Sequence, residues 1–145
     1  MAEQDARRYF RLNTDGGVVP ERGKASGEGA IGVVLVDPDE HVVHEISDRI
    51  GHVGDHHIAE YRALIAGLRL AFGHGISCIR AYVDSKLITD QMKGESRVGP
   101  DYLVLWRDAQ ALAGQFDDFD IELIPRKENK SADALASSAL KGIGK

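Results

Sequence analysis

Residues 30–50, AIGVVLVDPDEHVVHEISDRI, indicate the fold class of this chain. The apolar run at 30–37 strongly predicts a β-strand, and residues 41–50, although more polar, again have strand-like composition. The Pro-Asp-Glu segment at 38–40 between them favours a turn. This stretch therefore predicts two antiparallel strands joined by a short connection.

A further strand is expected upstream of this pair. Residues 9–14, YFRLNT, have the period-2 alternation of a strand, which is expected to stop at Asp15. The glycine-rich stretch 16–29 lacks helical periodicity and predicts a mobile loop. The polar residues 1–8 are expected to form a flexible segment. The three strands would then form an antiparallel meander.

Helical periodicity begins after the third strand. From about residue 55 to residue 72, apolar side chains recur in one helical stripe that ends at Phe72, and Glu60 lies near the start of this helix. The remaining segments alternate between the two patterns. They predict a strand at 78–85, helices at 85–94 and, from Pro100, at 101–116, a strand at 119–125 and a helix at 131–141.

This order of elements predicts an α/β fold with a five-stranded mixed sheet flanked by helices, in a single domain over residues 9–141. A chain of 145 residues with 43% hydrophobic residues can bury one core. Neither a membrane span nor a signal peptide is recognisable, so we expect a cytoplasmic monomer. Cys78, the lone cysteine, is expected to be a buried free thiol.

The formal charge of −5 argues against a protein that binds nucleic acid chiefly through a broad basic surface. It does not exclude nucleic acid. Clustered acids that bind divalent cations reverse the sign of the local field, and a phosphate could then be held by metal.

Four acids are candidates for such a cluster. Asp15 and Asp84 follow apolar strands, whereas Glu60 and Asp133 fall in the opening turns of helices. Each alone could be a helix cap or a turn residue. Strand ends and helix starts, however, tend to gather at one crevice of an open α/β sheet, and four close carboxylates need a cation. Oxygen ligands suit Mg²⁺ or Mn²⁺, and no cysteine cluster indicates zinc.

A family resemblance is carried by four blocks: LNTDGG at 12–17, AEYRALIAGLRLA at 59–71, YVDSKL at 82–87 and IPRKENKSADALA at 124–136. In this order and spacing they resemble the signature blocks of type 1 ribonuclease H. The AEYRAL, DSKL and N-x-x-x-D-x-L-A patterns are specific, whereas DGG alone is not. The resemblance extends from about Tyr9 to Leu140 and implies a ribonuclease H-like fold.

The resemblance also implies an activity, the metal-dependent endonucleolytic hydrolysis of the RNA strand of RNA/DNA hybrids, with 5′-phosphate and 3′-hydroxyl ends. Two Mg²⁺ or Mn²⁺ ions would activate the water and stabilise the departing oxygen, with the four acids as ligands: Asp15, Glu60, Asp84 and Asp133. It implies substrate contacts, including contacts to ribose 2′-hydroxyls, at Gly16, Gly17, His56, His57, Ser85, Lys86 and Asn129.

Three features depart from the family pattern. The loop before the last acid lacks the histidine of many members, and Arg126 is the candidate catalytic replacement, although it can hold phosphate better than it can act as a base. His56 and His57 stand where familiar members have asparagines, and with His52 they also allow a transition-metal site, for which the sequence shows no supporting second shell. The segment 91–108 is too short for the basic handle of several bacterial members.

Two other functions stay open. The chain could be a catalytically silent nucleic-acid-binding module of the same fold, although such a module has no electrostatic reason to keep four repelling acids. It could also be a 3′ exonuclease or a strand-transfer enzyme, from which the AEYRAL and DSKL contexts distinguish it. Trp106 is expected to pack along its helix, not to stack on a base.

Overall fold

The computed structural model describes residues 8–143. Its elements are, in chain order, β1 (Phe10–Pro20), β2 (Gly27–Val36), β3 (Val42–Val53), α1 (His56–Gly73), β4 (Cys78–Val83), α2 (Lys86–Met92), α3 (Leu103–Ala113), β5 (Asp118–Leu123), one 3-10 turn (Arg126–Glu128) and α4 (Lys130–Ala139). The flexible segment expected at residues 1–8 lies, apart from Arg8, outside the described residues.

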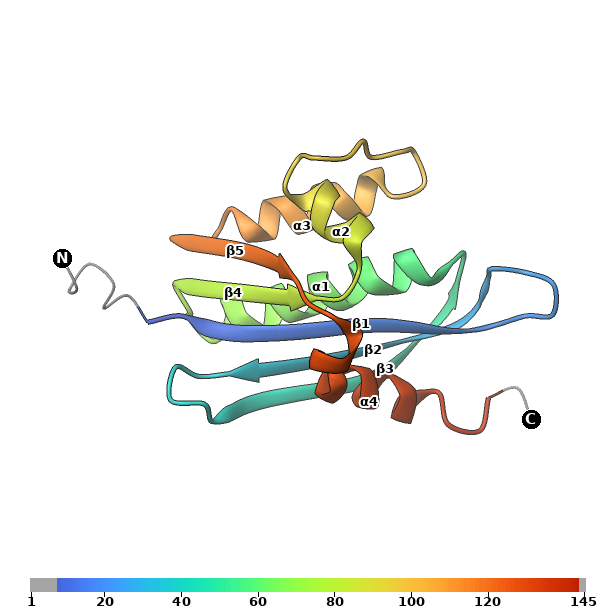
Figure 1. Cartoon of the computed structure of the whole chain (residues 1–145), viewed down its shortest axis with the longest axis horizontal. Coiled ribbons are helices and arrows are strands. Elements are labelled where there is room, and N and C mark those ends of the chain that lie inside the picture. Colours follow the sequence, from blue (N-terminus) through green and yellow to red (C-terminus); the bar gives the residue numbers. More distant parts are fainter. Residues whose placement is uncertain (1–7, 144–145) are drawn as a thin grey trace.

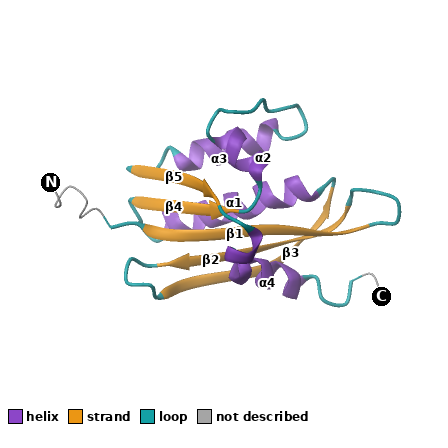
Figure 2. Ribbon diagram, viewed as in Figure 1, coloured by secondary structure: helices purple, strands orange, loops and turns teal. Residues whose placement is uncertain are grey.

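The strands form one mixed sheet in the order β3-β2-β1-β4-β5. β1 pairs antiparallel with β2 and parallel with β4, β3 is antiparallel to β2, and β5 is parallel to β4. Helix α1 lies on one face of the sheet, α2 and α3 lie beside it, and α4 crosses the other face (Figures 1 and 2). The predicted α/β fold, its five-stranded mixed sheet and its antiparallel meander are confirmed.

The first strand is longer than the sequence predicted, because β1 runs past Asp15 to Pro20. Gly16 lies opposite Ile31 of β2, and Gly17 lies opposite Ala30. The pairing with a buried, β-branched strand outweighs the low strand propensity of glycine. The mobile loop predicted over residues 16–29 is therefore wrong, and only residues 21–26 connect the two strands.

The main core lies between α1 and the face of the sheet that this helix covers. Its largest fully buried apolar side chains are Leu12, Val33, Leu35, Tyr61, Leu64, Leu68, Ile79 and Ile88. The predicted stripe of α1 is confirmed except at its end, where Phe72 is 48% exposed. Its ring packs edge-on against Phe116, at 6.1 Å between centroids.

The helix expected from Pro100 begins instead at Leu103, after a turn. Trp106 of this helix packs against the main core, and its indole Nε1 donates to the Gln91 carbonyl at 3.0 Å. Cys78 is only partly buried, because it begins β4 near the sheet's end. None of the helices within residues 8–143 combines the length and hydropathy needed to span a bilayer.

Helix α4 packs closely on the opposite face of the sheet. A Cβ atom at Gly32 of β2 would lie 2.0 Å from the carbonyl oxygen of Ala132. The helix can pack this closely on the strand only because Gly32 has no side chain. A small second cluster, Val34, Val36 and Ala132, joins the two elements. This contact fixes the start of α4 beside β1, where polar residues gather.

Candidate active site

Asp15 lies within the central strand, not at its end as the sequence suggested. Strand alternation turns Thr14 toward α1, with its methyl group in the space left by Gly67, and turns Asp15 toward the face that α4 covers. Asp15 is 9% exposed. A buried carboxylate in the middle of a sheet is costly unless a cation or a proton compensates it.

Glu60 comes close to β1 because Gly16 lacks a side chain. A Cβ atom at Gly16 would lie 2.2 Å from the carbonyl carbon of Ala59 and 2.4 Å from the backbone nitrogen of Glu60. The helix start is fixed by Asp55, whose side chain accepts a hydrogen bond from the Ile58 amide at 3.0 Å. The first glycine of the Asp-Gly-Gly motif therefore allows the close approach of α1.

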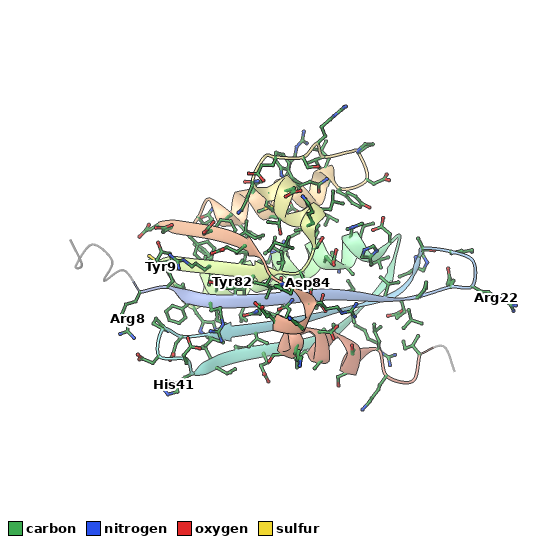
Figure 3. The ribbon with its side chains drawn as sticks, in the orientation of Figure 1. Arg8, Tyr9, Arg22, His41, Tyr82 and Asp84 are labelled. Atoms are coloured by element: carbon green, nitrogen blue, oxygen red, sulfur yellow. The ribbon has the colours of Figure 1, made fainter. Side chains whose placement is uncertain are left out.

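Asp84 lies at the junction of β4 and α2, as the sequence predicted. Figure 3 labels it near the middle of the molecule, where β4 ends. The side-chain amide of Asn129 donates to the Asp84 carboxylate at 3.1 Å and to the Thr14 carbonyl at 3.0 Å. Asn129 accepts in turn from Asn13 at 3.0 Å. Asp84 is thus held in a fixed orientation against β1.

Asp133 lies in the first turn of α4, also as predicted. Its carboxylate is 3.4 Å from the Arg126 guanidinium, which is largely exposed. Such an exposed ion pair contributes little to stability. Arg126 is therefore free to turn toward a bound anion.

The structure brings the four acids to one cavity. Donor oxygens of Asp15, Glu60 and Asp84 all lie within 4.8 Å of one another. Asp133 is in contact with Asp15, and both line a cavity of about 340 Å³. Its lining includes the four acids together with Gly16, Gly17, Val18, His56, Arg126, Ala136, Ser137 and Leu140.

The proximity of these acids changes their protonation. Burial, followed by the charge of Asp84 and contacts with Asp133, raises the pKa of Asp15 to about 8. Burial also raises the pKa of Glu60 to about 7, against the opposing effect of a hydrogen bond from Ser85. A cation between the carboxylates would reverse both shifts, because it stabilises the ionised forms.

The donor set fits a hard divalent cation. One carboxylate oxygen of Glu60, Oε1, is buried without a hydrogen-bond partner in the described part of the chain. An orphaned buried oxygen beside two other carboxylates is accounted for by a ligand that accepts its lone pair. The oxygen-only set of Asp15, Glu60 and Asp84 suits Mg²⁺ or Mn²⁺.

The residues expected to contact substrate are placed in different ways. Gly16, Gly17 and His56 line the cavity. Lys86 is exposed but pairs with Asp90 at 2.6 Å. Ser85 caps α2 and is 8% exposed, and Asn129 is 1% exposed. Direct substrate contact by the side chains of Ser85 and Asn129 is therefore not what this structure favours, because protein groups already occupy them.

The histidines separate into two groups. His56 and His57 lie at the start of α1, with ring centroids 4.0 Å apart. His52, next to the last residue of β3, instead approaches Glu21 at 3.4 Å. The idea of one metal site formed by all three histidines is therefore wrong, since β3 ends and turns before the helix begins.

Sequence reasoning missed two supporting residues, Asn13 and Tyr102. Asn13 could have been found from strand alternation, which places it on the face of Asp15. Tyr102 donates its hydroxyl to Asp55 at 2.5 Å, across 47 positions of the chain. No local sequence pattern predicts a contact between residues so far apart in the chain.

Comparisons with known proteins agree on one relationship. A family model described as reverse transcriptase-like matches residues 13–139. The bifunctional protein Rv2228c of Mycobacterium tuberculosis is 39% identical over 130 residues, 89% of this chain and 35% of that protein. Ribonuclease HI of Halobacterium salinarum is 40% identical over 115 residues, 79% of this chain and 57% of that protein. The chain thus spans 35% and 57% of the lengths of these two curated relatives.

Solved structures give the same result. The N-terminal RNase H domain of Rv2228c, solved as a fusion with maltose-binding protein, has a TM-score of 0.84 and 38% identity, over 92% of this chain and 99% of that chain. LC11-RNase H1 in complex with an RNA/DNA hybrid has a TM-score of 0.78 and 30% identity, over 90% of this chain and 95% of that one. These similarities extend over nine tenths or more of this chain.

Proposed function

The chain belongs to the type 1 ribonuclease H family, and from this premise we propose that it is an endonuclease that hydrolyses the RNA strand of RNA/DNA hybrids. The products would carry 5′-phosphate and 3′-hydroxyl ends. The observation that carries the proposal is the convergence of Asp15, Glu60 and Asp84 within 4.8 Å, with Asp133 on the same cavity.

Asp15, Glu60, Asp84 and Asp133 would hold two Mg²⁺ or Mn²⁺ ions, which supply activation of the attacking water and charge stabilisation at the departing 3′ oxygen. The chain itself fixes the ligands. Asn129 orients Asp84, the cap at Asp55 fixes the turn that carries Glu60, and Gly16 lets that turn reach β1. Positioned ligands of this kind lower the reorganisation that a reaction would otherwise require.

The cavity also offers groups for the nucleic acid. Backbone groups of Gly16 and Gly17 are accessible there and suit recognition of ribose 2′-hydroxyls. The exposed guanidinium of Arg126 can turn from Asp133 to a phosphate oxygen. It remains protonated, so its role is to hold charge, not to accept a proton.

Substrate affinity is expected to depend on metal. The chain carries 18 Lys and Arg against 23 Asp and Glu, and the segment 91–108 supplies only three basic residues. Few phosphates can be neutralised by side chains, so contact through bound cations would carry much of the binding. Nanomolar affinity at physiological salt in the presence of chelator would contradict this part of the proposal.

A cleavage assay tests the function directly. An end-blocked RNA/DNA hybrid, labelled on either strand, is incubated with wild type, with Asp84→Asn and with the control Asp108→Asn, an exposed acid of α3. We expect internal cuts in the RNA strand with Mg²⁺ or Mn²⁺, no cuts with chelator, and loss of cutting in Asp84→Asn alone. Single-stranded and duplex RNA and DNA serve as substrate controls.

The same assay separates the competing functions. Cuts that begin only at an unblocked end would indicate an exonuclease. A folded protein that cuts nothing with either ion, yet gains thermal stability from Mg²⁺ as linkage requires, would indicate a silent binding module. Either result would overturn the proposed endonuclease.

A further inference from the structure

His56, His57 and Glu60 form a second group of metal-binding side chains at the start of α1. One donor atom from each lies within 4.8 Å of the others. His56 and Glu60 are four positions apart on the helix, and His57 and Glu60 are three apart, which are the spacings that bring helical side chains together. The two histidine rings themselves lie with their centroids 4.0 Å apart. Ligands of a tetrahedral Zn²⁺ ion lie about 3.4 Å apart, which small side-chain rotations would reach.

A second shell for His57 is already built. Tyr102 donates its one hydroxyl proton to Asp55 at 2.5 Å, so toward His57 Nδ1, 3.5 Å away, the tyrosine oxygen can only accept. This contact favours the neutral tautomer with its proton on Nδ1. The lone pair on Nε2 is then free for a metal, and the chain Asp55, Tyr102, His57 orients the ring as second-shell groups do in metal sites.

The chemistry of this group differs from that of the carboxylate cluster. Two imidazoles and one carboxylate suit Zn²⁺ and similar transition-metal ions, whereas Mg²⁺ prefers oxygen alone. His56 is exposed, which leaves room for water as a fourth ligand. By contrast, His44 and His74, whose ring centroids lie 6.0 Å apart, belong to no such three-residue group within residues 8–143.

Glu60 belongs to both groups. We propose that His56, His57 and Glu60 bind a transition-metal ion of the Zn²⁺ class, and that this ion competes with the Mg²⁺ or Mn²⁺ ions of the carboxylate cluster by taking Glu60 as a ligand. The competition rests on the proposed function of that cluster as a metal centre, whereas the site itself does not. Zinc would thus inhibit the proposed hydrolysis by binding Glu60, the residue that the two sites share.

Binding is tested with Co²⁺, whose visible ligand-field spectrum reports coordination by nitrogen and a small coordination number. The titration is done without Mg²⁺ and repeated in excess Mg²⁺, which competes weakly for imidazole but, by taking Glu60, should lower the apparent Co²⁺ affinity. We expect a saturable spectrum in wild type, displaced by Zn²⁺. The affinity should fall at least about tenfold in His56→Ala and in His57→Ala, and several-fold in Tyr102→Phe. His44→Ala is the matched control and should equal wild type.

Competition is tested by Mn²⁺ binding with and without saturating Zn²⁺, measured by electron paramagnetic resonance, so that no enzymatic activity is needed. Zinc should lower the Mn²⁺ affinity at least about tenfold in wild type. In the double variant His56→Ala/His57→Ala, zinc should change the Mn²⁺ affinity much less. If zinc competes equally in the double variant, it binds the carboxylate cluster directly and the proposal is wrong.

Two further outcomes are decisive. A Co²⁺ spectrum unchanged by both histidine substitutions would overturn the site. Failure of the chain to cut RNA/DNA hybrids would overturn the proposed function while leaving the Co²⁺ result valid. If the chain is active, the zinc concentration for half-inhibition, normalised to each variant's own rate, should rise at least about tenfold in the double variant.

Discussion

The side-chain amide of Asn129 donates one hydrogen bond to the Asp84 carboxylate at 3.1 Å and another to the Thr14 carbonyl at 3.0 Å. This residue therefore ties together the strand that carries Asp15, the end of β4 and the start of α4. The Asp84 carboxylate is therefore already oriented in the metal-free protein.

Substitution of Asn129 tests this role. Asn129→Ala leaves the Asp84 carboxylate and a buried carbonyl without a donor, so we expect the free energy of unfolding to fall by about 1–3 kcal/mol. The affinity for Mn²⁺ should fall by about 10–100-fold. Chemical denaturation and calorimetric titration measure the two effects. Ser131→Ala, an exposed position on the same helix, is the control. An unchanged metal affinity would show that Asn129 serves packing alone.

Gly16 and Gly17 make a matched pair for testing the approach of α1. Gly16→Ala would place a methyl group 2.2 Å from the backbone of Ala59, whereas Gly17→Ala meets only the Leu140 side chain, at 3.4 Å. Gly16→Ala should therefore cost about 1–3 kcal/mol or more and displace Glu60. Gly17→Ala should change the free energy of unfolding by less than about 1 kcal/mol. Equal effects in urea denaturation would contradict the close contact.

The pH dependence of the metal-free protein follows from Asp15. Its pKa is raised from 3.8 to about 8 in the fold, first by burial and then by Asp84. Between these values the folded state binds more protons than the unfolded state, so the free energy of unfolding falls as pH rises from about 4 to about 8. Glu60, with its pKa raised to about 7, acts in the same direction.

Asp15→Asn should therefore flatten this dependence in chelator and increase stability at pH 8 by about 1–3 kcal/mol, with Glu60 accounting for the remaining slope. Thermal denaturation across the pH range measures it, with Asp108→Asn as the control. Added Mg²⁺ should stabilise wild type but not Asp15→Asn. A wild-type stability that rises with pH throughout this range would contradict the burial of an uncompensated Asp15.

Substitution of Arg126 should change the cleavage rate without changing stability. Its ion pair with Asp133 is 3.4 Å long and the guanidinium side chain is 81% exposed, so Arg126→Ala should change the free energy of unfolding by less than about 0.5 kcal/mol. If it holds a phosphate, the variant should cut RNA/DNA hybrids at least about tenfold more slowly, and Arg126→Lys should recover part of the rate. Steady-state kinetics decide this, and an unchanged rate would leave Arg126 a surface residue.

Most of the fold and the four acids of the cavity could be predicted from local sequence patterns. Periodicity predicted the helix that carries Glu60 and the junction at Asp84, because local backbone preference and burial act in the same direction there. It failed at residues 16–20, where glycine and proline oppose strand formation and only the pairing with β2 overcomes them.

The contacts that hold the site could not be predicted from such patterns. The approach of α1 to Gly16, the closeness of α4 to Gly32 and the contact between Asp55 and Tyr102 join residues far apart in the chain. Such contacts depend on distances between packed elements, and local sequence encodes preferences of backbone and burial but not those distances. The four candidate acids could thus be named from the sequence, whereas only packing places Glu60 beside both the other carboxylates and the two histidines.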